Sequence, residues 1–235
     1  MLQYVMLRPA HNVIWNLFLA AIPVVLALIV ARGVREDVRR DNRVRWWLWA
    51  PVLLVWLLFL PNTCYLLTEW RHYLQDLTTS RISFYATRSR DALVSLLVST
   101  GFYIVYSGAG LLSFFLAIWP LERLARARVG KLLAWAKPLG FFLCSLGVYL
   151  GLISRFNTWD LVFRHGKFSS DGVKEIFAVM SSSFHSSFTT TLILGFAVIL
   201  WVLYIGFDIW MDGFAWRMSR RRNMEGTSDD AETLS

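Results

Sequence analysis

The chain has 235 residues, of which 56% are hydrophobic and only 17% are charged. Soluble domains carry about 25% charged residues, so this composition excludes an ordinary soluble fold. The net charge is +8, but the basic residues are grouped between apolar runs and do not form one basic face. That arrangement excludes nucleic-acid binding and is typical of chains whose loop charges set their topology in a membrane.

Five apolar runs follow one another along the chain. A helix needs roughly 20 residues to cross a bilayer, and lipid offers no partner to the backbone groups of any open structure. The sequence therefore predicts an all-α, polytopic transmembrane helix bundle with about five spans. We expect them at 11–30, 46–67, 92–119 and 138–154, with a last span that starts between Ile176 and Phe188 and ends near Trp210.

The distribution of Lys and Arg predicts the orientation of the spans, because cytoplasmic loops carry the excess. Fifteen of the 24 basic residues lie in the first loop, the third loop and the segment after the last span, in dense clusters. We therefore expect the N-terminus outside and the C-terminus inside. The composition of residues 223–235, polar and acidic, predicts a disordered cytoplasmic tail. Residues 1–222 are expected to form a single transmembrane domain.

Small side chains in the fourth span indicate close packing. Gly147 and Gly151 have the spacing that lets two helix backbones approach. This spacing more often packs a neighbouring span than a second subunit, and a homodimer through these glycines is the alternative. The two cysteines, Cys64 and Cys144, lack a CxxC context. We expect them at different depths, as buried thiols without a disulfide.

Polar side chains sort onto one face where the second span ends. At the spacing of a helix they fall within an arc of about 80°, opposite a leucine face. Pro61 lacks an N–H and should kink or restart the helix just before them. The face begins inside the apolar layer and reaches its outer surface, and it consists of Asn62, Tyr65, Glu69, His72 and Asp76.

A second polar phrase, Arg155-Phe156-Asn157-Thr158-Trp159-Asp160, follows the fourth span on the same outer side. The planar fork of donors on Arg155 suits Glu69 or an anionic ligand. Asn157 and Asp160 add polar groups to this wall, whereas Trp159 has the ordinary role of an interface anchor. The structural alternative is that Glu69 pairs with an arginine and Asn62 bonds backbone freed near Pro61.

Known catalytic patterns are absent from the sequence, which has no HExxH or GxSxG motif and no phosphate-binding glycine loop. By ligand type alone, zinc could bind Glu69, His72 and a third residue such as Asp160 or His185. A single Glu-x-x-His copy supports this weakly, so we predict no metal ligands and name no cofactor. His185 lies in a serine run and more often has a structural role.

The motif Phe-Leu-Pro-Asn-x-x-Tyr-x-x-Thr-Glu-x-x-His, followed by Arg-x-Asn-x-Trp-Asp, resembles the bacterial membrane proteins catalogued as domain of unknown function, family thirteen sixty-one. The resemblance covers nearly the whole chain and implies a multi-pass protein of the bacterial inner membrane. Glu69 stands where much of that family has Asp. The family brings no established reaction. The motif positions are Pro61, Asn62, Tyr65, Thr68, His72, Arg155, Asn157, Trp159 and Asp160.

The leading functional hypothesis is a polar pocket between spans 2 and 4 that opens outward and binds a lipid headgroup or another small polar or anionic ligand. Its expected residues are Asn62, Tyr65, Glu69, His72, Arg155, Asn157 and Asp160. One alternative is a membrane-embedded hydrolase or transferase of the outer leaflet, with Glu69, His72 or Asp160 as catalytic candidates. Another is a structural or accessory subunit that the lipid bilayer surrounds.

Overall fold

The computed structural model describes residues 10–130, 132–152, 163–164, 167–168, 174, 178, 180–181 and 185–233. Helices dominate them. In chain order the elements are α1 (Ala10–Asp41), α2 (Trp46–Phe59), α3 (Pro61–Thr68), α4 (Trp70–Ser80), α5 (Ile82–Ala86), α6 (Arg90–Val129), α7 (Leu132–Leu152), β1 (Phe163–Arg164), β2 (Lys167–Phe168) and α9 (Ser187–Thr233). The two short strands pair antiparallel, with Phe163 opposite Phe168.

Five stretches of the described residues are helical, long and apolar enough to cross a membrane. Large apolar side chains such as Trp47, Val105 and Trp135 point outward from them, as lipid contact requires. The prediction of an all-α, five-span bundle is therefore confirmed, and the chain is a multi-pass membrane protein. The spans are His11–Asp41, Trp46–Ser80, Arg90–Arg126, Trp135–Leu152 and Ser187–Arg220.

The second span is broken twice, and both breaks shape the polar face. α2 ends at Phe59, and Pro61 is the first residue of α3. A proline is tolerated at that position because its missing N–H would be unpaired in any case. The second break lies at Glu69, between α3 and α4. The expected single helix is thus three helices in series, with the restart at Pro61 that the sequence predicts.

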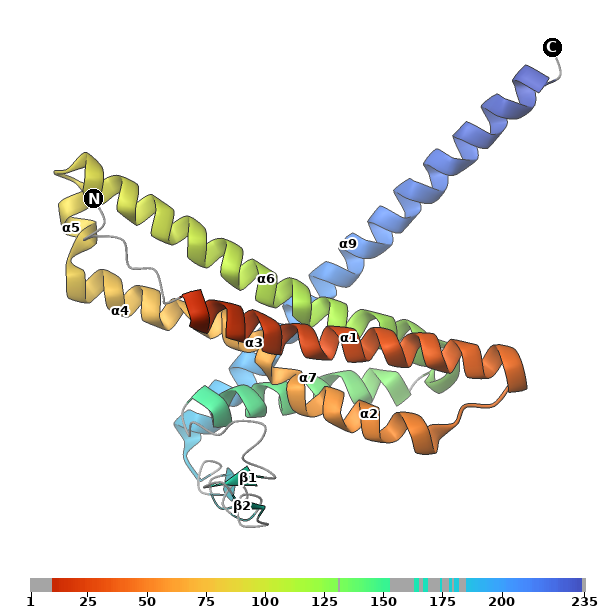
Figure 1. The fold of residues 1–235 in the computed structure, drawn as a ribbon, viewed down its shortest axis with the longest axis horizontal. Helices are drawn as coiled ribbons and strands as arrows, with labels where there is room; N and C mark the ends of the chain where they lie inside the picture. The colour runs from red at the N-terminus through yellow and green to blue at the C-terminus, as the bar shows by residue number, and fades with distance from the viewer. Residues whose placement is uncertain are drawn as a thin grey trace.

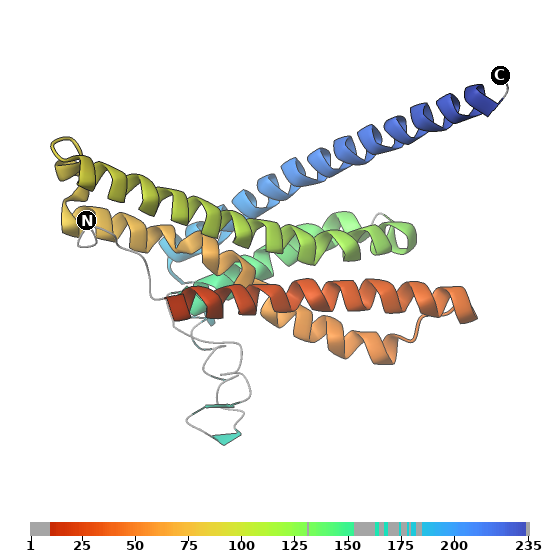
Figure 2. The ribbon, with the colours of Figure 1, turned by 45° about the horizontal axis from the view of Figure 1, so that its top comes forward.

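α3 occupies the centre of the bundle, where it packs against α1, α6 and α7 (Figures 1 and 2). Side-chain hydrogen bonds join neighbouring helices here, as is common in lipid. Ser107 of α6 donates to the Leu66 carbonyl at 3.3 Å, and Trp56 of α2 donates to the Ala117 carbonyl at 3.0 Å. The apolar core that surrounds this centre includes Leu60, Cys64, Phe114, Phe141, Val148, Leu200 and Tyr204.

The glycines of α7 form a groove that receives α3. A Cβ on Gly147 would lie 2.4 Å from Cγ of Pro61, and one on Gly151 would lie 1.0 Å from the hydroxyl oxygen of Tyr65. The Tyr65 hydroxyl donates to the Gly147 carbonyl at 3.3 Å. The GxxxG spacing therefore packs a neighbouring span of the same chain. The homodimer through these glycines stays a prediction.

The two cysteines meet in the core at this crossing. Cys64 and Cys144 are 0% and 1% exposed, and their sulfur atoms lie 3.6 Å apart. Both are free thiols, as the sequence predicts. The expectation that they lie at different depths is wrong, because the restart at Pro61 places the first turn of α3 directly against α7.

The last helix leaves the bundle. α9 packs against α7 near its start, and its second half projects away from the other helices in both views (Figures 1 and 2). Residues 223–233, for which the sequence predicts a disordered tail, are helical in this structure. Helices without a packed face are marginally stable in water, so the domain boundary at 222 stays a prediction.

Candidate functional site

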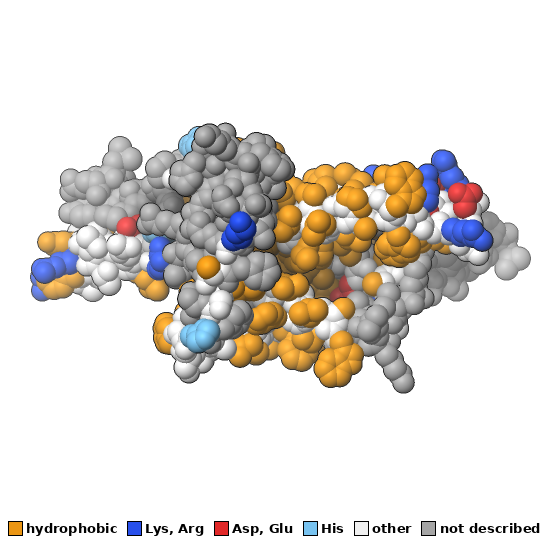
Figure 3. All heavy atoms as spheres, turned by 90° about the horizontal axis from the view of Figure 1, so that it is seen from below, with side chains coloured by type: hydrophobic (Ala, Val, Ile, Leu, Met, Phe, Trp, Pro, Cys, Tyr) orange, Lys and Arg blue, Asp and Glu red, His pale blue; other side chains and the backbone are white. Residues whose placement is uncertain are grey.

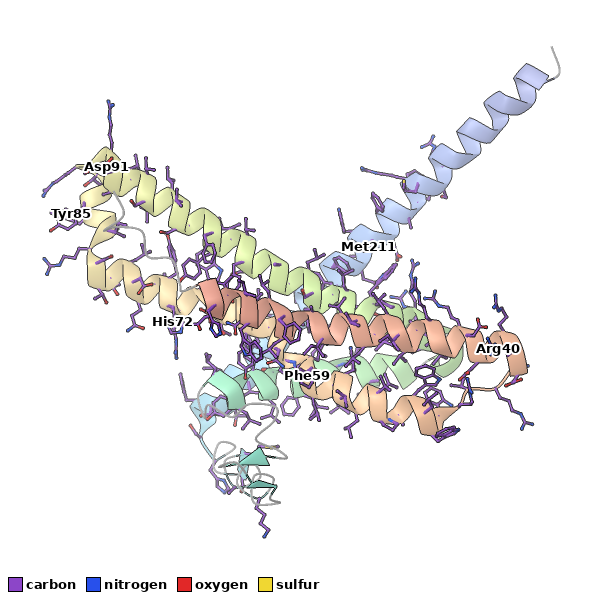
Figure 4. All side chains as sticks on the ribbon, in the orientation of Figure 1. Arg40, Phe59, His72, Tyr85, Asp91 and Met211 are labelled. Atoms are coloured by element: carbon purple, nitrogen blue, oxygen red, sulfur yellow. The ribbon has the colours of Figure 1, made fainter. Side chains whose placement is uncertain are left out.

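The predicted polar face spans the junction of α3 and α4. Asn62 and Tyr65 lie on α3, and Glu69 forms the junction. His72 lies in the first turn of α4 (Figure 4). Glu69 is only 9% exposed, and the other three side chains are half-buried. The structure thus keeps these four predicted residues along one stretch of the second span.

Asn62 has a local structural contact. Its side-chain amide donates to the Phe59 carbonyl at 3.1 Å, across the break before Pro61. Thr63 stabilises the same break through a 2.8 Å hydrogen bond from its hydroxyl to the Leu60 carbonyl. The hydrogen bond from Asn62 to the Phe59 carbonyl is the structural alternative that the sequence left open for Asn62.

Glu69 follows the contact between α3 and α7 by one turn. Its backbone stays in the right-handed helical region, and its carbonyl accepts the His72 N–H at 2.9 Å. Residues four apart share a helical face, so Glu69 lies one turn beyond Tyr65, which contacts Gly147 and Gly151. α7 ends one residue after that contact, at Leu152. Glu69 therefore lies one turn beyond the place where α3 contacts the end of α7.

The residues of the expected opposite wall lie outside the described part of the chain. They are Arg155, Asn157 and Asp160, together with Trp159. Of the ligands considered for zinc, Glu69, His72 and His185 are described. Among the described residues, no group of three His, Cys, Asp or Glu side chains could hold a metal ion. His185 is exposed, and its Nδ1 lies 2.7 Å from the Ser181 carbonyl.

A second buried carboxylate, Glu122 of α6, lies towards the other end of the bundle. It is 5% exposed and accepts hydrogen bonds from three helices. Arg126, one turn further along α6, donates to it at 3.0 Å, and Lys137 of α7 and Tyr204 of α9 contact it directly. Arg126 also pairs with Asp208 of α9. This cluster ties α6, α7 and α9 together in a region where lipid would otherwise meet charge.

Sequence reasoning missed this cluster because it treated Arg126 and Lys137 only as topology-setting charges. The available signal was Glu122 itself. It is the only acidic residue between positions 122 and 137, which also hold five basic residues, and it stands four residues before Arg126. A lone carboxylate beside an apolar span is a functional hypothesis in its own right.

A cavity of about 440 Å³ lies beside Glu122, between α1 and α2 on one side and α6 and α7 on the other. Its walls are apolar apart from Glu122 and Lys137. Figure 3 shows the apolar surface hollowed between two ridges, with acidic atoms at the floor of the hollow. Its lining includes Val34, Leu53, Trp56, Ala136, Lys137 and Gly140.

Five apolar spans with buried carboxylates at two levels define a helical, multi-pass membrane protein. Over residues 15–203 the chain matches the family described as Protein of unknown function (DUF1361), and it belongs to that family, as the motifs implied. No curated protein and no solved structure matches the chain.

Proposed function

We propose that this protein binds a lipid headgroup or another small polar or anionic ligand at the outer end of its second span, in the inner membrane of a bacterium, with its N-terminus outside. The observation that carries this proposal is Glu69, a carboxylate 9% exposed at the junction of α3 and α4. Ionisable groups at such positions are energetically costly, and they commonly mark ligand pathways.

The neighbouring side chains suit ligand recognition. Tyr65 and His72 lie one turn to either side of Glu69, so a phenol, a carboxylate and an imidazole follow one another along the second span. Both flanking side chains are half-buried. Together they offer donors and acceptors to a ligand that enters from the outer end.

Chain connectivity supports Arg155 as the opposite wall. It follows Leu152, the last residue of α7, by three positions. An extended chain covers at most about 3.6 Å per residue, so the chain can separate the Cα atoms of Leu152 and Arg155 by no more than roughly 11 Å. Tyr65, one turn before Glu69, contacts the same end of α7 at Gly151. In this proposal Arg155 binds the anionic part of the ligand through two parallel N–H donors, with Asn157 and Asp160 beside it.

The test is to identify polar lipids and metabolites that remain on the purified protein, by mass spectrometry. Wild-type protein should retain a species that Glu69→Gln and His72→Ala lose. Asp76→Asn is the matched control, because Asp76 is half-buried on α4, one turn beyond His72. It should retain the species at the wild-type level.

Two results would count against the proposal. One is an identical set of retained molecules on all four proteins. The other is failure of both Glu69→Gln and His72→Ala to fold, which would assign the polar face a structural role.

A further inference from the structure

We infer a second binding site, in the cavity beside Glu122, for an anionic phospholipid whose acyl chain fills the cavity and whose phosphate lies at Lys137. This site is separate from the polar face at Glu69. It lies towards the end of the bundle where α2 begins and α6 ends, which carries the dense arginine clusters.

The cavity has the size and lining for a chain-like apolar ligand. Its volume of about 440 Å³ falls within the roughly 300–1,000 Å³ of typical ligand pockets. Val34, Leu53, Leu121 and Phe141 contribute apolar walls from four helices. The hollow opens on an apolar face of the molecule (Figure 3). In a bilayer that face meets acyl chains, so a lipid chain is the apolar molecule that reaches it.

The polar end of the cavity offers unused donors. Glu122 is neutralised by Lys137 and Arg126 and accepts from Tyr204. An ammonium has three donors and no acceptor. Lys137 is 27% exposed, so it can hold Glu122 and donate to a second oxygen at the cavity mouth. A phosphate there would lie where the apolar wall ends and the basic surface begins.

The surrounding charge favours an anionic headgroup over a zwitterionic one. Residues 32–45 hold six arginines and three acidic residues, and residues 122–137 hold five basic residues and one acidic residue. Both segments border the cavity, through Val34 and Lys137. Basic pockets between transmembrane helices bind anionic lipid headgroups in this way.

The structure supplies a direct way to fill the cavity. Gly140 lines it, and a Cβ built at this position meets no atom within 4 Å. Gly140→Leu should therefore place its side chain in the cavity without displacing a neighbour. Gly108 of α6 is equally open but does not line the cavity, so Gly108→Leu is the matched control.

The experiment is a native mass-spectrometry titration of purified full-length protein with dioleoyl phosphatidylglycerol and dioleoyl phosphatidylethanolamine. Wild type and Gly108→Leu should bind phosphatidylglycerol more tightly than phosphatidylethanolamine. Gly140→Leu should bind phosphatidylglycerol about tenfold more weakly, which would correspond to a 1.4 kcal/mol loss. Gly140→Leu should cause the same loss when it is made in the Glu69→Gln background, so failure here and failure at the outer site are distinguishable.

Either of two outcomes overturns the inference: wild-type affinity for phosphatidylglycerol in Gly140→Leu, or equal binding of the two lipids by the wild type. If Gly140→Leu does not yield monodisperse protein, Ala136→Leu gives the same reading, because Ala136 also lines the cavity, one turn earlier on α7. Filling the cavity from that position must lower phosphatidylglycerol binding as well.

Discussion

Single residues decide how closely the central helices approach. Tyr65 is half-buried because α7 has no side chain at Gly151, where a Cβ would lie 1.0 Å from the tyrosine hydroxyl oxygen. The hydrogen bond to Gly147 then fixes the rotation of α3. Glu69, one turn later, takes its direction from that rotation. A change at Gly151 should therefore affect the polar face through Tyr65, although it replaces none of the face's own side chains.

Gly151→Ala tests this contact. It should lower the free energy of unfolding by about 1–3 kcal/mol, the usual effect of overpacking a tight contact. The control Gly108→Ala places its Cβ in open space, and it should stabilise α6 by up to about 1 kcal/mol because alanine is the better helix former. SDS titration in mixed micelles measures both. An unchanged unfolding midpoint for Gly151→Ala would show that α3 and α7 do not pack in this way.

The residues of the polar face could be found in the sequence because a helix sorts side chains by spacing alone. Pro61 and the four polar positions after it lie within one stretch of chain, so no knowledge of neighbouring helices was needed. The Glu122 cluster draws its members from α6, α7 and α9. Its discovery required knowing which helices meet, and apolar periodicity does not supply that information.

At the scale of elements, charged contacts join helices at their basic ends. Asp37 of α1 is 2% exposed and accepts a 2.8 Å hydrogen bond from Nε of Arg45 and another from Nε1 of Trp49. The turn between α1 and α2 is thereby fixed. Glu122 has the same role for α6, α7 and α9. Each carboxylate pairs with basic side chains that would otherwise face lipid, and each joins two or more helices.

Asp37→Ala should destabilise the protein by about 2 kcal/mol, because it leaves the Trp49 and Arg45 donors without their acceptor. Its neighbour Glu36 is the control. Glu36 pairs with Arg39 and Arg40 on the exposed surface, and Glu36→Ala should change stability by no more than about 0.5 kcal/mol. Equal effects of the two substitutions in an SDS titration would contradict the role given to Asp37.

Glu122→Leu should be more severe, at about 3–5 kcal/mol, because it leaves Lys137 and Arg126 near the bundle interior without their carboxylate. The double variant Glu122→Leu with Lys137→Met removes one of the stranded charges together with its partner. It should therefore recover a measurable part of the loss. Strictly additive losses in the same titration would argue that the two side chains do not interact.

At the scale of the whole molecule, the five spans were predictable because span length and apolar composition are local properties of the chain. The division of the second span at Pro61 was also local. The meeting of Cys64 with Cys144, the use of Gly147 and Gly151 inside the chain, and the cavity between four helices were not, since each depends on helix pairing. The orientation of the bundle rests on the arginine clusters alone.

Cysteine labelling in intact cells tests that orientation. With the N-terminus outside, Ser83→Cys in α5 should react with a membrane-impermeant maleimide, and Arg43→Cys between α1 and α2 should react only after the cells are opened. Both positions are exposed, and the native Cys64 and Cys144 are buried, so the signal comes from the introduced thiol. The reverse labelling pattern would place the polar face at the inner surface.

The proposed outer binding site requires Glu69 and Arg155 to lie close together. A double-mutant cycle measures this proximity: the unfolding free energies of Glu69→Gln, Arg155→Gln and the double variant, determined by SDS titration. If the two side chains form one site, the single effects should differ from additivity by about 0.5–3 kcal/mol. Effects that add within about 0.3 kcal/mol, the behaviour of distant sites, would contradict a shared site.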